Sequence, residues 1–241
     1  MATAAAIIVG DEVLSGKVVD ENTPWLIKRC RDLGLDLVRI SVVPDHVVAI
    51  AEEVVRSRAL ADWVFTTGGV GPTHDDVTMN GIASAFEVPL QRSQKLEDLL
   101  RNHMGDRCNE AALKMTDLPV GAELWWDGAI RFPVVVMKSV VVFPGIPSLF
   151  RQKFDAVSHR FASEPSTIKE LRLCARESEI AERLQQAQER WPQVSVGSYP
   201  KLGGGPWSVR VILDSRDVQS LEACCASLRE SLSQELVEVV G

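Results

Sequence analysis

The stretch from Thr66 to Thr78, Thr-Thr-Gly-Gly-Val-Gly-Pro-Thr-His-Asp-Asp-Val-Thr, joins a glycine-rich turn to two adjacent carboxylates. The run before it, 62–65, is apolar and β-rich, which predicts a buried strand that ends at the turn. The run after it, 77–86, predicts a helix, and its capping candidates are Asp75, Asp76 and Thr78. Glycines let successive backbone N–H groups face one point, and the helix adds the positive end of its dipole. The stretch therefore predicts an anion site.

The two carboxylates of this stretch would repel a phosphate unless a divalent metal lay between them and the anion. The pattern matches neither the P-loop nor the dinucleotide fingerprint, so both of those readings are disfavoured. Glycine pairs also end strands for purely steric reasons, and that alternative stays open at this point.

Composition limits the class of protein. The chain has 241 residues, 46% of them hydrophobic and 24% charged, which is typical of a soluble globular protein with a real core. The formal net charge of −7 argues against nucleic-acid binding. No apolar run is long enough to cross a bilayer, and residues 1–10 are uncharged, so we expect a cytoplasmic protein without a leader or membrane contact. The five cysteines, without CxxC spacing, predict reduced thiols and no zinc site.

The pattern of elements predicts the fold class. Strands are expected at 4–9, 35–43, 62–65 and 140–143, alternating with helices at 20–33, 47–59, 77–86 and 147–161. This alternation predicts a three-layer α/β/α domain with a mostly parallel sheet, whose ligands bind beyond the carboxyl ends of the strands. A further helix is expected at 93–104, and a hairpin at 123–137 with its turn at Asp127–Gly128.

A polar, proline-bearing break at 163–167 predicts a domain boundary. The first domain is expected to span 1–162. The second, 168–241, is expected to be a small α+β unit of βαββα order. Its predicted elements are strands at 170–175, 194–199 and 208–214 and helices at 178–191 and 218–232.

The stretch 66–78 resembles the signature of the molybdopterin-binding fold family, which includes MogA/MoaB-type enzymes and the N-terminal domains of CinA-like proteins and eukaryotic FAD synthase. Other parts of the chain agree with it in order: Gly10-Asp11-Glu12 with Leu14 and Gly16, Val43-Pro44-Asp45, and Phe143-Pro144-Gly145-Ile146-Pro147. The resemblance is closest to the N-terminal domain of FAD synthase. There it extends to Arg131-Phe132-Pro133 and Gly197-Ser198-Tyr199-Pro200, so it covers essentially the whole chain.

The resemblance implies that Asp45 and Asp76 lie near the reacting phosphates and hold a divalent metal, Mg²⁺, Mn²⁺ or Co²⁺, with a monovalent cation as a further option. His74 is the third catalytic candidate, as a donor to phosphate or to a leaving group. The alternative for each aspartate is a helix N-cap. The expected substrate-binding residues are Gly10, Asp11, Glu12, Thr67, Gly68, Gly69, Gly71, Pro72, Thr73, Asp75, Thr78, Pro144 and Gly145.

The resemblance also implies an activity. The leading hypothesis is a metal-dependent pyrophosphatase, a hydrolase that converts FAD to FMN and AMP or cleaves ADP-ribose. Molybdopterin binding with adenylylation is the alternative, and a non-catalytic flavin or nucleotide sensor is the third. Trp125, Trp126 and Tyr199 could stack on a flat ring, with core or hairpin packing as the alternative for the tryptophans. The expected partners are a small molecule and further copies of this chain.

Overall fold

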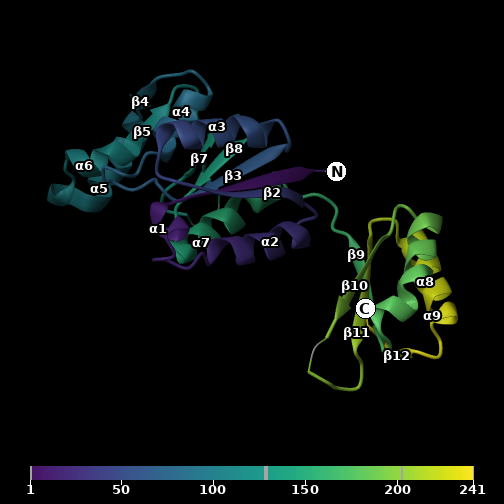
Figure 1. Ribbon diagram of the computed structural model, residues 1–241. Helices are drawn as coiled ribbons and strands as arrows, with labels where there is room; N and C mark the ends of the chain where they lie inside the picture. Colours follow the sequence, from purple (N-terminus) through teal and green to yellow (C-terminus); the bar gives the residue numbers. More distant parts are fainter. Residues whose placement is uncertain (1, 128–129, 202, 241) are drawn as a thin grey trace. The chain divides into compact units, whose positions relative to one another are not determined.

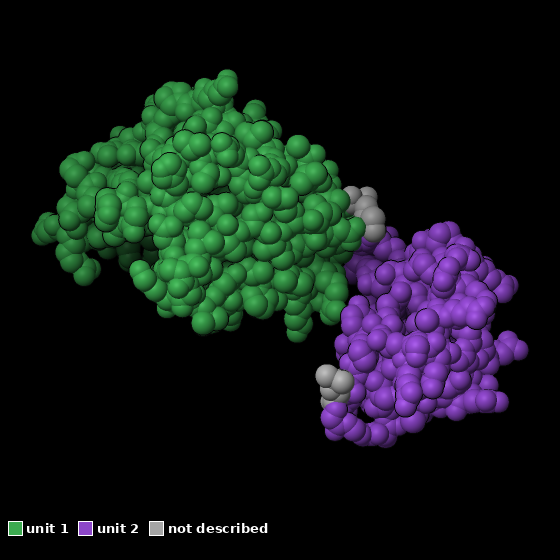
Figure 2. All heavy atoms as spheres, viewed as in Figure 1, with its two compact units in different colours: residues 1–163 green, residues 164–241 purple. Residues whose placement is uncertain are grey.

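The computed structural model describes residues 2–127, 130–201 and 203–240. The chain divides into two compact units, residues 1–163 and 164–241 (Figure 2). Among the described residues, no helix combines the length and the apolar character that crossing a membrane would require.

In the described part of unit 1, a six-stranded sheet has the order β2-β1-β3-β8-β7-β6. Its strands are β1 (Thr3–Val9), β2 (Asp36–Val43), β3 (Trp63–Thr67), β6 (Glu123–Trp125), β7 (Val134–Met137) and β8 (Val140–Phe143). The four strands β2, β1, β3 and β8 run parallel, while β7 and β6 are antiparallel additions at one edge. The predicted α/β class with a mostly parallel sheet is confirmed.

Strand β1 shows why this sheet is covered on both faces. Ala4, Ala6 and Ile8 point into one core, and the residues between them point into the other. Helices α2 (Asn22–Asp32) and α7 (Pro147–Val157) cover the first face, and α3 (Val47–Arg58) and α4 (Thr78–Ala85) cover the second (Figure 1). All the ligand-binding loops expected from the sequence leave the carboxyl ends of the parallel strands.

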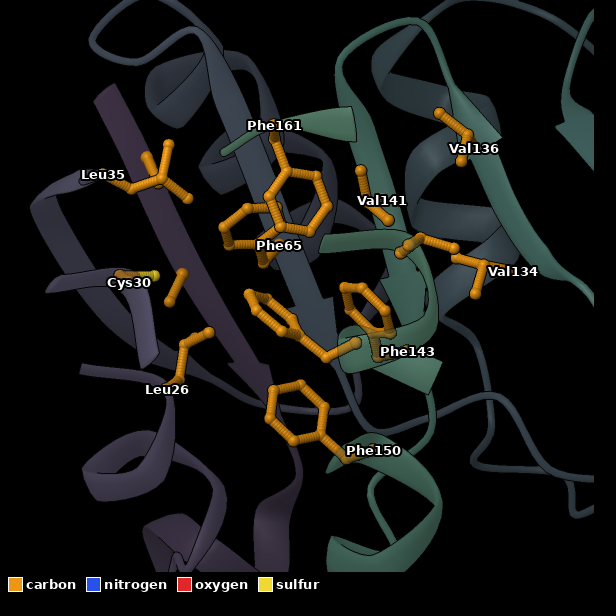
Figure 3. Packing of buried hydrophobic residues seen from close by; sticks show 14 of the residues in the cluster. Leu26, Cys30, Leu35, Phe65, Val134, Val136, Val141, Phe143, Phe150 and Phe161 are labelled. Carbon is orange, nitrogen blue, oxygen red and sulfur yellow. The ribbon is translucent and has the colours of Figure 1, made fainter. Parts of the chain in front are cut away.

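Phenylalanines fill the first core (Figure 3). The ring of Phe65 on β3 lies 4.9 Å from that of Phe161 and 6.2 Å from that of Phe143 on β8, and Phe143 in turn lies 5.4 Å from Phe150 on α7. Each of these rings buries a large apolar area. The packing fixes β3 and β8 immediately below the loops that follow them.

Two segments of unit 1 differ from the prediction. Residues 11–14, expected in a loop, form a short helix, α1 (Asp11–Leu14). The segment between α4 and β6 adds a two-stranded sheet, β4 (Leu90–Arg92) with β5 (Asp117–Pro119), and a short helix, α6 (Glu110–Leu113), beside the expected α5 (Gln94–Met104). Elements of three or four residues are too short for periodicity to reveal. Strands β6 and β7 pair as predicted, but the predicted turn includes Gly128, which lies outside the described residues.

Unit 2 contains β9 (Thr167–Leu173), α8 (Glu177–Arg190), β10 (Ser195–Pro200), β11 (Val209–Ser215), α9 (Val218–Ser231) and β12 (Leu236–Val240). Its described residues form an antiparallel sheet of order β10-β11-β9-β12, with α8 and α9 packed on one face. The predicted βαββα order is wrong at its end, because β12 adds a fourth strand. This edge strand keeps Val237 and Val240 exposed, so it shows little of the alternation that predicts a half-buried strand.

All five cysteines are free thiols, as predicted. Cys30, Cys224 and Cys225 are buried, and burial raises the pKa of Cys30 to about 12. Cys30 acts as a small hydrophobic residue in a core of unit 1, and Cys224 and Cys225 do so in the core of unit 2.

Candidate functional site

Four loops meet at the carboxyl ends of the parallel strands. The loop after β1 is tied to the loop after β2, because the backbone N–H of Asp11 donates to Oδ2 of Asp45 at 2.9 Å. The loop after β3 is tied to the loop after β8, because the Thr67 hydroxyl donates to the Pro144 carbonyl at 2.9 Å. A Cβ atom on Gly145 would lie 3.3 Å from Cα of Gly68, so these two loops touch through their backbones. The predicted convergence of the loops is therefore present.

The glycines of the turn are required by space as well as by backbone angle. Gly68 and Gly69 have φ values of +101° and +62°, in the region that glycine favours. A Cβ on Gly68 would lie 2.1 Å from the Val9 carbonyl oxygen, and one on Gly69 would lie 2.4 Å from Oγ1 of Thr78. The turn thus lies directly against β1 and the start of α4.

The same turn lies between the two predicted metal ligands. A Cβ on Gly69 would be 3.4 Å from Oδ1 of Asp45, and one on Gly71 would be 2.6 Å from Oδ2 of Asp76. The backbone from Gly69 to Gly71 therefore runs from a point beside Asp45 to a point beside Asp76. Within the described residues, the backbone N–H groups of Gly69, Val70 and Gly71 have no hydrogen-bond acceptor. Three successive free donors beside two carboxylates suit an anion accompanied by a cation.

The helix-cap alternative is wrong for both aspartates. The N-cap residue of α3 is His46, that of α4 is Val77, and neither helix start has a side-chain cap. Asp45 instead accepts from the backbone of Asp11. Oδ2 of Asp76 accepts from the N–H of Thr73 at 2.8 Å and from the hydroxyl of the same residue.

The predicted capping of α4 by Thr78 and Asp75 is wrong as well. The Thr78 hydroxyl donates back to the carbonyl of Gly68 at 2.8 Å, and its side chain is buried. Residues 72–76 form a loop of their own before the helix begins, which separates the carboxylates from the first helical N–H groups. The two aspartates thus hold loops and do not cap a helix.

Burial and neighbouring charge raise the pKa of the Asp45 carboxyl. Burial is the larger cause, and Glu12, Asp11 and Asp75 add repulsion, while the hydrogen bond from the Asp11 N–H works the other way. The pKa of Asp75 is lowered, first by its hydrogen bond with Thr73. A cation bound near Asp45 would relieve this crowding of like charges.

His74 is 99% exposed at its side chain and lies 3.9 Å from Asp75. Pro72 and Thr73 are exposed on the same loop. These residues form the outer wall of the turn, and the catalytic role of His74 stays a prediction.

Two functional candidates were missed by sequence reasoning. Asn22 is 6% exposed, and its amide donates to Thr67 Oγ1 at 3.0 Å and to the Gly145 carbonyl at 2.8 Å. The N-terminus of α2 is therefore hydrogen-bonded to the end of β3 and to the loop after β8. The buried Oδ1 of Asn22 has no hydrogen-bond partner in the part of the chain that the structure describes. In the sequence, the only indication of a role for Asn22 was its place near the start of the helix expected at 20–33.

Lys114 is the second missed residue. Its ammonium donates to the carbonyl of Thr73, and with Gly69, Gly71 and Asp76 it lines a cavity of about 270 Å³. The lysine lies in the segment between α6 and β5, for which the sequence predicted no element. No local pattern could have linked it to the turn, whereas Lys17, the lysine nearest the first loop in sequence, is exposed.

Several other predicted substrate-binding residues lie on the first loop and beside Asn22. Glu12 folds over Gly10, since a Cβ on that glycine would lie 2.7 Å from its carboxylate. Glu12, Thr67, Gly68 and Gly145 line a smaller pocket of about 110 Å³ beside Asn22. Four of the predicted substrate-binding residues thus line this smaller pocket, while Gly69 and Gly71 line the cavity of Asp76 and Lys114.

The aromatic candidates lie elsewhere. Trp125 packs edge-on against Trp63 with 6.0 Å between ring centroids, and Arg160 covers its ring, so its role is packing. Lys95 lies over the ring of Trp126 at 4.7 Å. Tyr199 belongs to β10 of unit 2 and is half exposed.

The donor set fits a hard divalent cation. Asp45 and Asp76 offer carboxylate oxygens, which Mg²⁺ and Mn²⁺ prefer. Because Gly69 and Gly71 have no side chain, space stays open beside each of these carboxylates. Among the described residues, no group of three or more His, Cys, Asp or Glu could hold a metal by itself. A cation here would accordingly take its other ligands from water and from substrate phosphates, as Mg²⁺ commonly does.

Comparisons with known proteins agree with this geometry. Residues 5–163 match the family model described as a probable molybdopterin binding domain, and residues 165–240 match the middle domain of FAD synthase. A protein of Archaeoglobus fulgidus is 32% identical over 95% of this chain and 97% of its own length. A probable FAD synthase of Caenorhabditis elegans is 30% identical over 98% of this chain but 51% of its own length. This chain thus spans about half of that relative.

The crystal structure of CinA from Thermoplasma acidophilum has a similar fold. Its TM-score is 0.61 at 24% identity, and the likeness covers 66% of this chain and 98% of that one. The resemblance inferred from the stretch 66–78 is confirmed by the family match, by the relatives and by this fold. The chain belongs to the molybdopterin binding domain family, and its second unit is similar to the middle domain of FAD synthase.

Proposed function

We propose that this chain is a metal-dependent nucleotide pyrophosphatase that hydrolyses FAD to FMN and AMP, with ADP-ribose as a related substrate. One observation supports it above the others: the turn at 68–71, with its free N–H groups, lies between Asp45 and Asp76, and neither carboxylate caps a helix. The names of the FAD synthase relatives point to FAD as the nucleotide.

The substrate's diphosphate would bind at the turn. The N–H groups of Gly69, Val70 and Gly71 donate to its oxygens, and Lys114 adds positive charge on the side of Asp76. Asp45 and Asp76 would hold a divalent cation, which would supply the charge that a diphosphate needs in a chain of net charge −7 and would lower the pKa of a bound water.

The reaction consumes one water molecule. The water oxygen attacks one phosphorus of the diphosphate, and the bond from that phosphorus to the bridging oxygen breaks. The bridging oxygen leaves with the other phosphate, so one phosphate ends in FMN and the other in AMP. The proton lost by water passes to a carboxylate of the site or to solvent.

Molybdopterin binding with adenylylation is the second candidate, because the matched family model is described by that ligand. The same turn would then bind the phosphate of the pterin and those of ATP. A protein that binds flavin or nucleotide without turnover is the third.

One assay separates the three. The full chain is incubated with FAD, with ADP-ribose, or with molybdopterin and ATP, each with Mg²⁺, Mn²⁺ or Co²⁺, and the products are separated by chromatography. Formation of FMN and AMP, abolished by EDTA and by Asp76→Ala, supports the proposal. Adenylylated pterin supports the second candidate instead. Binding of FAD without any product under all three metals would reject hydrolysis.

A further inference from the structure

A larger pocket opens beside the glycine turn, with Val70 and Pro144 in its lining. Its volume is about 480 Å³, within the usual range for small-molecule sites. Its walls are mainly apolar side chains of α5, β7, β8 and α7, with Leu96, Leu100 and Val142 among them. Val70 and Met79 line both this pocket and the cavity of Asp76 and Lys114, so the two spaces adjoin along the turn.

Among the described residues, two permanent cations line this mainly apolar pocket: Lys153 on α7, and Arg107 after α5, which is an exposed residue. Nζ of Lys153 donates to the carbonyl oxygens of Phe132 and Pro133, at 3.0 and 2.5 Å. No carboxylate among the described residues pairs with it. An ammonium has three N–H groups, so one donor remains after two of them donate to the carbonyls. Lys153 is partly buried, and a charge withdrawn from water without a counter-ion is costly, which is unusual unless a ligand uses it.

The ligand that fits must be amphipathic. One part must be apolar, to cover the leucine, valine and methionine walls, and methionine sulfur is favourable against an aromatic ring. Another part must present an acceptor to Lys153. It must also be joined to a phosphate, because the pocket adjoins the cavity beside the turn through Val70 and Met79.

Of the two rings of FAD, the flavin meets these conditions better than adenine. The isoalloxazine ring has a dimethylbenzene edge without hydrogen-bonding groups and a pyrimidinedione edge with two carbonyl oxygens. Adenine also offers acceptors, its ring nitrogens, but it has no edge comparable to the dimethylbenzene edge and so suits the apolar walls less well.

We infer that this pocket binds the isoalloxazine ring of FAD, with a carbonyl of its pyrimidinedione edge at Nζ of Lys153 and its dimethyl edge among the side chains of α5. The inference rests on the proposed function for the position of the diphosphate. It assigns Lys153 as the residue that selects a flavin nucleotide over other diphosphates such as ADP-ribose. Leu149, 41% exposed on the same helix, lines the pocket nearer to solvent.

Binding of flavin without hydrolysis tests the inference directly. Riboflavin, FMN and AMP are each titrated into the full chain in EDTA; flavin fluorescence reports the first two, and calorimetry reports AMP. Riboflavin and FMN should bind, and Lys153→Met should weaken both by about tenfold to a hundredfold, the range for a hydrogen bond to a charged group. Lys28→Met, at an exposed lysine of α2, is the matched control and should leave both affinities unchanged.

A second variant guards against misfolding of the first. Leu149→Trp adds bulk at the mouth of the pocket from an exposed position, so it should fold and still lower the affinity for riboflavin. With turnover measured, Lys153→Met should also lower the ratio of kcat/KM for FAD to that for ADP-ribose.

The outcomes distinguish this inference from the proposed function. Flavin binding that depends on Lys153 in a chain that hydrolyses nothing would uphold the pocket and reject the pyrophosphatase. Hydrolysis of FAD in a chain whose riboflavin affinity is indifferent to both Lys153→Met and Leu149→Trp would uphold the pyrophosphatase and reject the pocket. Tighter binding of AMP than of riboflavin, weakened by Leu149→Trp, would assign the pocket to adenine and overturn the inference.

Discussion

The backbone N–H of Asp11 donates to Oδ2 of Asp45 at 2.9 Å, which joins the loops that follow two neighbouring parallel strands. The bond engages one oxygen of a carboxylate whose other oxygen lies near Gly69 of the turn. Asp45 therefore holds the site together and also faces it.

Asp45→Asn separates these two roles. The amide keeps an oxygen that can accept from Asp11 but loses the charge, so turnover of FAD should fall at least about a hundredfold. Burial and the neighbouring carboxylates raise the pKa of Asp45 above its ordinary 3.8, so the folded state binds this proton more readily than the unfolded state. The contribution of this group to stability therefore decreases as pH rises through that raised pKa.

At pH 7, Asp45→Asn should accordingly raise the free energy of unfolding, as expected where function and stability compete. Urea unfolding and product chromatography on the same samples measure both effects. Asp32→Asn, at an exposed aspartate of α2, is the control and should change neither. Full turnover in Asp45→Asn would remove that carboxylate from the mechanism.

Asp76→Ala should abolish turnover while the chain stays folded. The variant loses the hydrogen bonds from the Thr73 backbone and hydroxyl, and because the loop is exposed, the cost should be about 1 kcal/mol. Thr73→Val removes the hydroxyl bond alone and leaves the carboxylate in place. If Thr73→Val lost as much turnover as Asp76→Ala, the aspartate would act by shaping the loop and not by binding a cation.

Gly69→Ala tests whether the turn must stay open. Alanine at φ +62° is strained, and its Cβ would lie 2.4 Å from Oγ1 of Thr78, so we expect a loss of stability well above 1 kcal/mol and loss of nucleotide binding. Gly16→Ala is the matched control, because Gly16 has φ +71° and nothing within 4 Å of its Cβ position. That variant should show the backbone strain alone, about 1 kcal/mol. Thermal unfolding and FAD titration of the two variants compare them, and equal effects would mean that the space beside Gly69 is unimportant.

Lys153 should make stability depend on pH in the alkaline range. Burial lowers its pKa from 10.5 to about 8, so between those values the unfolded chain binds the proton and the folded chain does not. Stability from this group therefore rises as pH increases from about 8 to 10.5. Between pH 7.5 and pH 10, the free energy of unfolding of the natural chain should gain about 2 kcal/mol relative to Lys153→Met. Parallel urea curves at the two pH values measure the difference, and a constant difference would show that Lys153 is well solvated.

The sequence predicted the class of the fold because the relevant patterns are long. The apolar runs of β1, β3 and β8 and the helices between them each show a period that one element can display alone. The sequence did not predict the short elements, for the opposite reason. Strand β12 at an edge, the β4–β5 pair and helix α1 gain their stability from contacts with other segments, and three to five residues cannot display a period.

For the site, the sequence by itself determined the acidic and glycine-rich chemistry at 66–78 and its place after a strand, because neighbours in a turn are neighbours in the chain. Only the tertiary structure decided that Asp45 and Asp76 hold loops and do not cap helices. It alone brought Asn22, Lys114 and Lys153 to the turn and its pockets. Such residues approach through the packing of separate helices and strands, and the distance between them in space has no counterpart in their spacing along the chain.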